Sequence, residues 1–301
     1  MSKKERVVDV VLTKLAVGYR NPAYVGTRLF PVVKVDKEGV KIPKFGKEAF
    51  RIYKTLRAAG GSTNLYRLDG VTTQNVVLQE HDFGVPIDYR DKKESLFNEE
   101  RRAISVGGKA IDNELEMTIA NIAQNTSNYS ASHKKALSNT TCWDQSAGHP
   151  VADIVAAMDK ISEDVGVEPN VMIVGAEAWG ILKEHSEILA KIKHTQNAVA
   201  TEELVASIFG LKEVVVGRAL YDDNGTMKRI WGDNVILAYV PSETESYDEP
   251  AAGYTLQMEG FRYVDKYDAE GGKIEIVRTT DMFEVAQTGA DAMYLISNIK
   301  K

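Results

Sequence analysis

One stretch of the chain carries a helical pattern much longer than an ordinary helix. Over residues 93–126, apolar side chains recur at spacings of seven, four and three, and they are Phe97, Ile104, Ile111, Leu115, Ile119 and Ile122. Such spacings place side chains on one face of an α-helix. No uncharged apolar run reaches the roughly 18 residues that a membrane span requires. We therefore predict a long amphipathic helix, the spine, over residues 93–126, about 50 Å long at about 1.5 Å per residue.

Two adjacent glycines, Gly107 and Gly108, interrupt the predicted spine near its middle. Each interior glycine costs about 0.8–1.0 kcal/mol relative to alanine, so the pair needs a compensating role. One explanation is that another backbone packs closely against the helix. The other is a bend point, because kinks collect at Gly and Ser pairs and Ser105 lies just upstream. We hypothesise a hinge at Gly107 and Gly108 that bends differently in different copies or states.

The chain before the spine alternates apolar anchors with residues that break helices. Leu29, Phe30 and Val32 surround Pro31, and Pro43 follows, so we expect an extended arm with little core of its own that needs another surface to lie on. Residues 50–56 and 71–83 then predict two strands around a polar, glycine-containing tip.

An isolated two-stranded ribbon is marginal in water. This hairpin therefore either forms a sheet edge on its own domain or crosses a neighbouring subunit. Arg57, Arg67 and Asp69 flank the tip and are our candidates for ion pairs between subunits. Leu29, Phe30 and Val32 are our candidates for apolar anchors at the same interface.

The pattern changes to alternating helices and strands over residues 150–242. Pro150 suits a first helical turn, and the apolar face that follows it ends at Gly166. Residues 171–174 form a buried-strand run, and Thr201 is a good N-cap for a later helix. We predict an α/β unit here.

The last part of the chain is mainly β. The predicted strands cover residues 254–258, 262–267, 273–277, 281–286 and 292–296. The strand of the early hairpin and the spine are their natural partners. We therefore expect an α+β fold in which the first and last thirds form one discontinuous domain, with the α/β unit inserted.

Composition narrows the classes of function. The net charge is −6 and the isoelectric point is near 5.5, which argues against a dedicated nucleic-acid binder. Cys142 is the only cysteine among 301 residues, which excludes intrachain disulfides and cysteine-rich zinc or iron–sulfur sites. The first residues lack the apolar run of a signal peptide, so we expect a cytoplasm-like compartment.

Catalytic motifs are scarce. Residues 175–180 have the outer glycine spacing of a phosphate loop but lack the Lys-Ser/Thr that follows it, so we interpret them as a strand-to-helix turn. On a strand over residues 80–82, His81 faces away from its two acidic neighbours. Residues 222–225 lack the alternating ligands of a calcium loop, and no base can be paired with Cys142. We predict no catalytic residue, no cofactor and no metal site.

The order of several loose motifs carries a resemblance that no single motif would. These motifs are RLFPVV at 28–33, PVADI at 150–154, PNVMIVG at 169–175, AWGIL at 178–182, IFG at 208–210, VVVG at 214–217, IWGD at 230–233 and AMYLI at 292–296. Together with the arm, hairpin and spine, they cover essentially the whole chain, which resembles the major capsid proteins of tailed bacteriophages.

The resemblance implies the tailed-phage capsid fold. Its parts are an N-terminal arm, an extended β-hairpin loop, a peripheral domain in which the spine helix accompanies a β-sheet, and an inserted α/β axial domain. We assign them to residues 1–48, 49–86, 87–149 and 150–242, with residues 243–301 as C-terminal strands that return to the peripheral and axial domains.

The resemblance also implies a function. The expected protein is a structural subunit, not an enzyme, that self-assembles as hexamers and pentamers into an icosahedral head. The head encloses double-stranded DNA without sequence-specific binding, and no membrane is involved. The virion is the expected location, after assembly in the host cytoplasm. The arm starts almost at Met1 without a long helical extension, so we expect a separate scaffolding protein, with the portal and a cement protein as further partners.

Two alternatives stay open at this point. A cellular nanocompartment shell of the same fold would carry an interior cargo site, which the sequence does not locate. A cytoplasmic α+β enzyme with a dispersed site would form a small oligomer with a concave pocket lined by converging polar groups.

Overall fold

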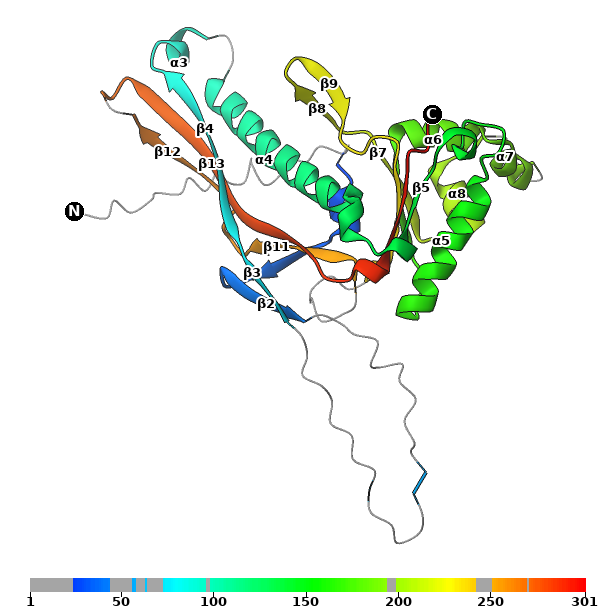
Figure 1. Ribbon diagram of the computed structural model, residues 1–301. Coiled ribbons are helices and arrows are strands. Elements are labelled where there is room, and N and C mark those ends of the chain that lie inside the picture. Colours follow the sequence, from blue (N-terminus) through cyan, green and yellow to red (C-terminus); the bar gives the residue numbers. More distant parts are fainter. Residues whose placement is uncertain are drawn as a thin grey trace.

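A long helix, α4 (Glu99–Gln124), runs between two β-sheets and contacts both (Figure 1). The computed structural model describes residues 24–43, 56–57, 63, 73–95, 98–193, 199–241, 251–269 and 271–301. The predicted spine is confirmed as a helix, but it begins at Glu99 because the Asn98 side chain accepts a hydrogen bond from Arg101 N at 2.9 Å. A separate short helix, α3 (Asp91–Glu94), precedes it.

The first sheet joins strands from both ends of the sequence. Its order is β1-β11-β13-β12, with β4 also paired to β13. The bounds are β1 (Val32–Val35), β4 (Gln79–Asp88), β11 (Gly253–Met258), β12 (Tyr263–Asp268) and β13 (Ile274–Gln287). The predicted pairing of early and late strands is therefore confirmed.

Strand β13 is the centre of this sheet. It pairs with β4 from Ile274↔Asp88 to Phe283↔Gln79, and with β12 and then β11 along its other edge. We predicted two strands here, and the structure has one strand of 14 residues. The residues between the two predicted strands are Arg278, Thr279 and Thr280, which include no glycine or proline to end a strand.

The second sheet has the order β5-β14-β10-β6-β7. Its strands are β5 (Lys134–Ala136), β14 (Met293–Ser297), β10 (Val235–Ala238), β6 (Val171–Gly175) and β7 (Glu213–Gly217). Four helices are associated with it, namely α5 (Pro150–Val165), α6 (Ala176–Glu184), α7 (Ser186–Ile192) and α8 (Glu202–Phe209). The α/β alternation was predicted. The participation of β5 was not predicted.

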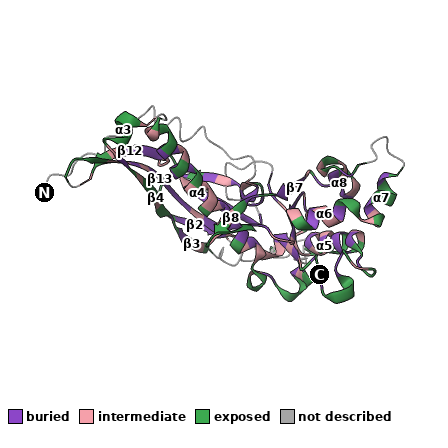
Figure 2. Cartoon of the chain, turned by 90° about the horizontal axis from the view of Figure 1, so that it is seen from above, coloured by how far each residue is buried: buried purple, intermediate pink, exposed green. Residues whose placement is uncertain are grey.

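The central strands β6 and β10 of the second sheet consist entirely of buried residues, and Figure 2 colours buried residues purple. In β6, Met172 and Val174 belong to the core formed with α5–α8, whereas Val171 and Ile173 belong to the core formed with the end of α4. A strand covered on both faces has a continuous apolar sequence, which explains the VMIVG run.

Two hairpins complete the described chain. In the first, β2 (Gly39–Pro43) pairs with β3 (Thr73–Val77), and in the second, β8 (Leu220–Asp223) pairs with β9 (Thr226–Arg229). The predicted strand over 71–83 is therefore divided between β3 and β4, and its described partner is β2. The predicted partner at 50–56 lies outside the described residues, except Leu56. The short helical turns are α2 (Gly26–Leu29), η2 (Thr126–Asn128), η3 (Ala131–His133), η4 (Asn139–Thr141) and η5 (Ala290–Ala292).

The spine lies very close to the first sheet at Gly107. A Cβ atom there would lie 2.7 Å from Thr279 Oγ1, whereas a Cβ at Gly108 would lie 3.9 Å from Arg262 Nη2. Close packing, the first of our two explanations, therefore accounts for Gly107. The hinge hypothesis at Gly107 and Gly108 stays a prediction.

We expect the two glycines to respond oppositely to alanine. Gly107→Ala should lower the free energy of unfolding by about 1–3 kcal/mol, because overpacking forces stiff neighbours to shift. Gly108→Ala should be neutral or stabilising by up to about 1 kcal/mol, through helix propensity. Urea unfolding of both variants measures this. Adding Thr279→Ala should recover part of the Gly107→Ala loss, and equal effects of the two alanines would contradict the packing explanation.

Candidate functional site: the spine helix and its junctions

The predicted apolar anchors of the arm lie inside the subunit. Leu29 and Phe30 are fully buried in the core that includes Ile119, and Val32 is half-buried at the start of β1. Strand β1 pairs in parallel with β11, and Thr255 Oγ1 donates to Phe30 O at 2.9 Å. The surface that the arm was expected to need is therefore supplied, for residues 24–43, by the spine and the first sheet of the same subunit. A role for these side chains between subunits stays a prediction.

The polar candidates are less completely described. Arg57 is exposed, whereas Arg67 and Asp69 lie outside the described residues. The predicted ion pairs between subunits therefore stay predictions.

A buried carboxylate joins the arm, the spine and the second sheet. Glu116 is 2% exposed. Its Oε1 accepts hydrogen bonds from Val25 N at 2.9 Å and Trp231 Nε1 at 2.6 Å, and its Oε2 accepts one from Gly26 N at 2.8 Å. Burial raises the pKa of Glu116, and the three donors oppose that shift. A Cβ at Gly26 would lie 2.7 Å from Oε2, so the contact requires glycine at this position.

The segment around Trp231 is fixed by further contacts. A Cβ at Gly217 would lie 2.4 Å from the Trp231 indole, so the strand end can pass the ring only without a side chain. The Gln124 side chain donates to Ile230 O at 2.9 Å and accepts from Asn234 Nδ2 at 2.6 Å. The C-terminal half of the spine is thus attached to the second sheet by polar contacts on both sides of Trp231.

The N-terminal half of the spine is attached to the first sheet by ion pairs. Glu100 lies 2.7 Å from both Lys92 and Lys266, and Lys92 also pairs with Glu275 at 2.9 Å. Hydrogen bonds from Lys266 and Lys92 lower the pKa of Glu100. One turn beyond Gly108, Asp112 binds Arg262 at 2.8 Å. Both ends of α4 are therefore held by specific polar contacts as well as by apolar packing.

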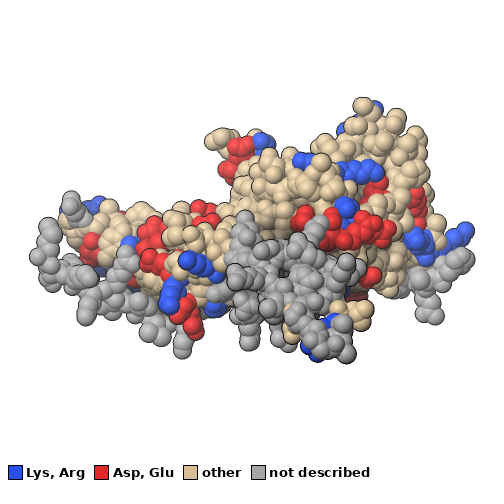
Figure 3. Space-filling view, turned by 60° about the horizontal axis from the view of Figure 1, so that its bottom comes forward, with Lys and Arg blue, Asp and Glu red and all other residues tan. Residues whose placement is uncertain are grey.

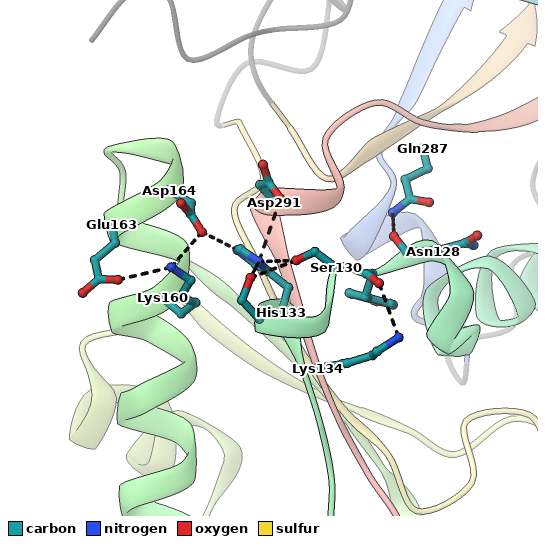
Figure 4. Close-up of polar contacts among 11 residues, drawn as sticks. Asn128, Ser130, His133, Lys134, Lys160, Glu163, Asp164, Gln287 and Asp291 are labelled. Atoms are coloured by element: carbon teal, nitrogen blue, oxygen red, sulfur yellow. Dashed lines mark hydrogen bonds and ion pairs between the residues drawn. The ribbon is translucent and has the colours of Figure 1, made fainter. Parts of the chain in front are cut away.

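A group of polar side chains around His133, here called the histidine cluster, holds the segment that follows the spine (Figure 4). His133 is 1% exposed, with Nε2 at 3.4 Å from Asp164 and Nδ1 at 3.8 Å from Asp291. Ser130 Oγ lies 3.0 Å from Nδ1, and Lys160 pairs with Asp164 at 3.0 Å. The residue types are those of a nucleophilic triad, but the buried ring sits between carboxylates of α5 and η5. This geometry favours a structural clamp between these elements.

A second clamp lies on the same segment. Trp143 is 1% exposed and donates from Nε1 to Asp153 at 2.9 Å. Lys135 of β5 binds the same carboxylate at 2.5 Å. Together with the histidine cluster, these contacts dock residues 130–143 onto α5 and the second sheet.

The motifs that we interpreted as non-catalytic form ordinary structural features. Strand β6 ends at Gly175 and α6 begins at Ala176, as a strand-to-helix turn requires. Residues 222–225 form the β8–β9 turn. His81 stacks on Phe283 at 4.0 Å and pairs with Glu114 at 3.3 Å, and Cys142 is a buried free thiol. Among the described residues, no group of three or more His, Cys, Asp or Glu could hold a metal ion.

Surface charge is mixed. On the face shown in Figure 3, acidic side chains gather in groups and basic ones are scattered. In the part of the chain that the structure describes, no helix is long and apolar enough to cross a membrane.

Glu116 was not among the predicted site residues. Its position three residues before Ile119 was the available signal, because residues three apart share a helix face. The donors that make its burial possible come from distant segments and are not visible in a local pattern.

Comparisons with known proteins give a consistent result. The family model described as phage major capsid protein E matches residues 22–275. The major capsid protein of Burkholderia phage BcepMu is 42% identical over 301 residues, covering 98% of each chain. A phage-related protein from Bordetella bronchiseptica RB50 is similar in structure, with a TM-score of 0.81, 30% identity and 98% of each chain covered. The capsid of cyanophage P-SCSP1u shares the fold, with a TM-score of 0.58 and 11% identity over 98% of this chain and 91% of that one.

We expect Glu116→Gln to lower the free energy of unfolding by about 1–3 kcal/mol, because an amide cannot accept from all three donors and leaves a buried group unsatisfied. Glu114→Gln is the matched control on the same helix. That side chain is 57% exposed, and its pair with His81 should be worth about 0–1 kcal/mol. Denaturant unfolding measures both variants, and equal losses would contradict the role of Glu116.

The same variant should reveal the titration of the carboxylate. A raised pKa means that the folded chain binds this proton more readily than the unfolded chain. The stability that this proton adds is therefore fully present below the unfolded pKa and is lost as pH rises through the folded pKa. The stability difference between wild type and Glu116→Gln should consequently grow as pH falls from about 7 to 4. A difference independent of pH would contradict the pKa shift.

Proposed function

This chain belongs to the phage major capsid protein E family and is a structural subunit of a phage capsid, and from this premise we propose how it assembles. Subunits form hexamers and pentamers, and these close into an icosahedral head around double-stranded DNA. The observation that carries the proposal is the full-length likeness to the major capsid protein of phage BcepMu. The sequence motifs that led to the resemblance agree with it.

We propose that the chain is divided as the family fold implies. Residues 1–48 are the arm, 49–86 the extended loop, 87–149 the peripheral domain, 150–242 the axial domain and 243–301 the returning strands. The pairing of β4 with β13 supports a peripheral domain built from both ends of the sequence. The pairing of β14 with β10 supports the return of the chain to the axial domain.

We propose contacts between subunits at the tip of the extended loop and at the arm. We propose that the loop tip, with Arg57, Arg67 and Asp69, forms ion pairs with a neighbour, and that the arm around Leu29, Phe30 and Val32 supports the same contact. Exposed ion pairs are worth only about 0–1 kcal/mol each. Closure of a shell makes later contacts effectively intramolecular, so several weak contacts per subunit suffice.

The spine glycines have a place in this proposal. A bend at Gly107 and Gly108 would let one sequence occupy hexamers and pentamers. The close approach of Gly107 to Thr279 means that such a bend must also move β13, so the hinge couples the spine to the first sheet. The double variant Gly107→Ala plus Gly108→Ala should therefore change particle size or closure, and unchanged particles would end the hinge hypothesis.

The remaining partners are proposed from the net charge of the chain and from the family resemblance. A net charge of −6 suits a shell that encloses DNA without gripping it, because every lysine or arginine paired with a phosphate adds salt-dependent affinity. We propose a separate scaffolding protein, a portal and a cement protein as partners, assembly in the host cytoplasm, and no catalytic activity of the subunit.

Electron microscopy and light scattering of the purified protein, alone and co-expressed with its scaffolding protein, test the assembly. Closed particles, or rings of five and six subunits, are expected. A small oligomer that persists with the scaffolding protein present would overturn the proposal. Closed particles that contain a protein cargo instead of DNA when isolated from infected cells would favour the nanocompartment.

Two truncations separate assembly from folding. Deleting residues 1–23 removes none of the described contacts, so the subunit should fold and fail to close shells. Deleting residues 1–30 also removes Val25, Leu29 and Phe30 from the core, at about 1.5–3 kcal/mol for each side chain, and should unfold the subunit. Circular dichroism and sedimentation measure the two outcomes. Normal particles from the shorter deletion would contradict the role of the arm.

A further inference from the structure

The β8–β9 hairpin stands clear of the rest of the subunit, on the opposite side from the β2–β3 hairpin (Figure 1). It forms a two-stranded sheet and pairs with no other strand among the described residues. Isolated two-stranded hairpins are marginal in water. An element of this kind that keeps a defined shape is a candidate for contact with another molecule.

The turn gives this hairpin a fixed shape. Asn224 and Gly225 both have positive φ, at 52° and 87°, which is the combination of a type I′ turn and matches the twist of the strands. Asp222 Oδ1 accepts from Gly225 N at 2.7 Å. The tip is therefore pre-organised.

The register divides the side chains between two faces. Tyr221 pairs with Lys228 and Asp223 with Thr226 on one face. Tyr221 packs against the core around α4, and Lys228 binds Asp223 at 2.5 Å. Tyr221 therefore attaches this face to the subunit, the Lys228–Asp223 pair lies within the hairpin, and Thr226 and Lys228 are exposed.

The other face is exposed and unusually apolar for a free hairpin. It carries Leu220 opposite Arg229 and Asp222 opposite Met227. Leu220 is 43% exposed, Met227 is 62% exposed, and the two charged side chains are exposed as well. The two apolar side chains lie on one diagonal of this four-residue face, and the opposite charges lie on the other diagonal.

This arrangement is self-complementary. We propose that the hairpin is a two-fold contact between copies of this chain in the shell, with the axis along the diagonal from Leu220 to Met227. A two-fold rotation about that line brings each apolar residue against itself. It also places each Arg229 against Asp222 of the other copy, so one contact contains two ion pairs. A symmetric contact requires such a patch, because the same surface serves both partners.

The proposal rests on the assembly function, because only a shell supplies the second copy at high local concentration. The patch has only four residues, far smaller than a standard interface. The contact should therefore form within particles and be absent from dilute subunits. A cement protein seated on the hairpin is the competing occupant, and the experiment below separates the two.

Cysteine cross-linking tests the axis directly. Cys142 is buried, so Leu220→Cys introduces one accessible thiol at a position that should meet its own copy. Facing sheets lie about 10 Å apart, beyond the Cα separation of a disulfide, so a short bismaleimide is the appropriate cross-linker. Treating particles with it should yield covalent dimers on a denaturing gel. Met227→Cys is a second variant with the same expectation. Thr226→Cys, exposed on the other face of the same hairpin, is the matched control and should remain at least about tenfold less cross-linked.

Charge exchange tests the ion pairs. Arg229→Glu sets like charges against each other and should lower particle yield several-fold at low salt, with partial recovery at high salt. Asp222→Asn keeps the oxygen that accepts from Gly225 N and removes the like charge, so combined with Arg229→Glu it should restore part of the yield lost in Arg229→Glu alone. Arg229→Gln should weaken assembly more than Lys228→Gln, its neighbour on the other face. Circular dichroism checks that each subunit is folded.

The outcomes are distinguishable from failure of the assembly function itself. Closed wild-type particles without a cross-link at position 220 or 227, or with equal cross-linking at 226, would overturn the two-fold contact and leave the shell function intact. Cross-linking to a different protein would assign the hairpin to a cement partner and likewise overturn the proposal. Absence of wild-type particles would contradict the assembly function first.

Discussion

The structure depends on one buried carboxylate, that of Glu116. A charge taken out of water is costly unless it is fully hydrogen-bonded, and Glu116 accepts from three donors in two segments: the backbone N–H groups of Val25 and Gly26, and the indole of Trp231. None of these donors lies in the spine helix itself. Removing either set of donors would leave a buried carboxylate with unsatisfied hydrogen bonds. Glu116 therefore holds both the arm and the segment around Trp231 on the spine.

The spine helix therefore connects the two sheets. Ion pairs of Glu100 and Asp112 hold its first half to the first sheet, and Glu116 and Gln124 hold its second half to the second sheet. Gly107 lets the spine helix lie close to Thr279. These contacts at both ends of the spine fix the positions of the two sheets relative to each other within the subunit.

The parts that project from the spine and its sheets are the ones that we propose to make weak contacts with neighbouring subunits. The exposed face of the β8–β9 hairpin combines two apolar side chains with opposite charges, and Arg57 lies exposed in the loop region. No single contact of this size would hold two proteins together in dilute solution. In a shell each subunit makes several at once, so modest surfaces are sufficient and allow errors in assembly to be corrected.

The sequence by itself determined the local elements, since their signals are local. The periodicity of the spine, Pro150 and Gly166 at the ends of α5, and Thr201 before α8 each act within a few residues, and the structure has these helices. The order of the motifs determined the family. Tertiary structure alone decided that Leu29 and Phe30 are core residues, that β13 is one strand, that β5 joins the second sheet, and that Glu116 is buried. Each of these depends on partners more than 80 residues away in the sequence, and a local pattern carries no information about which distant donor or strand will arrive.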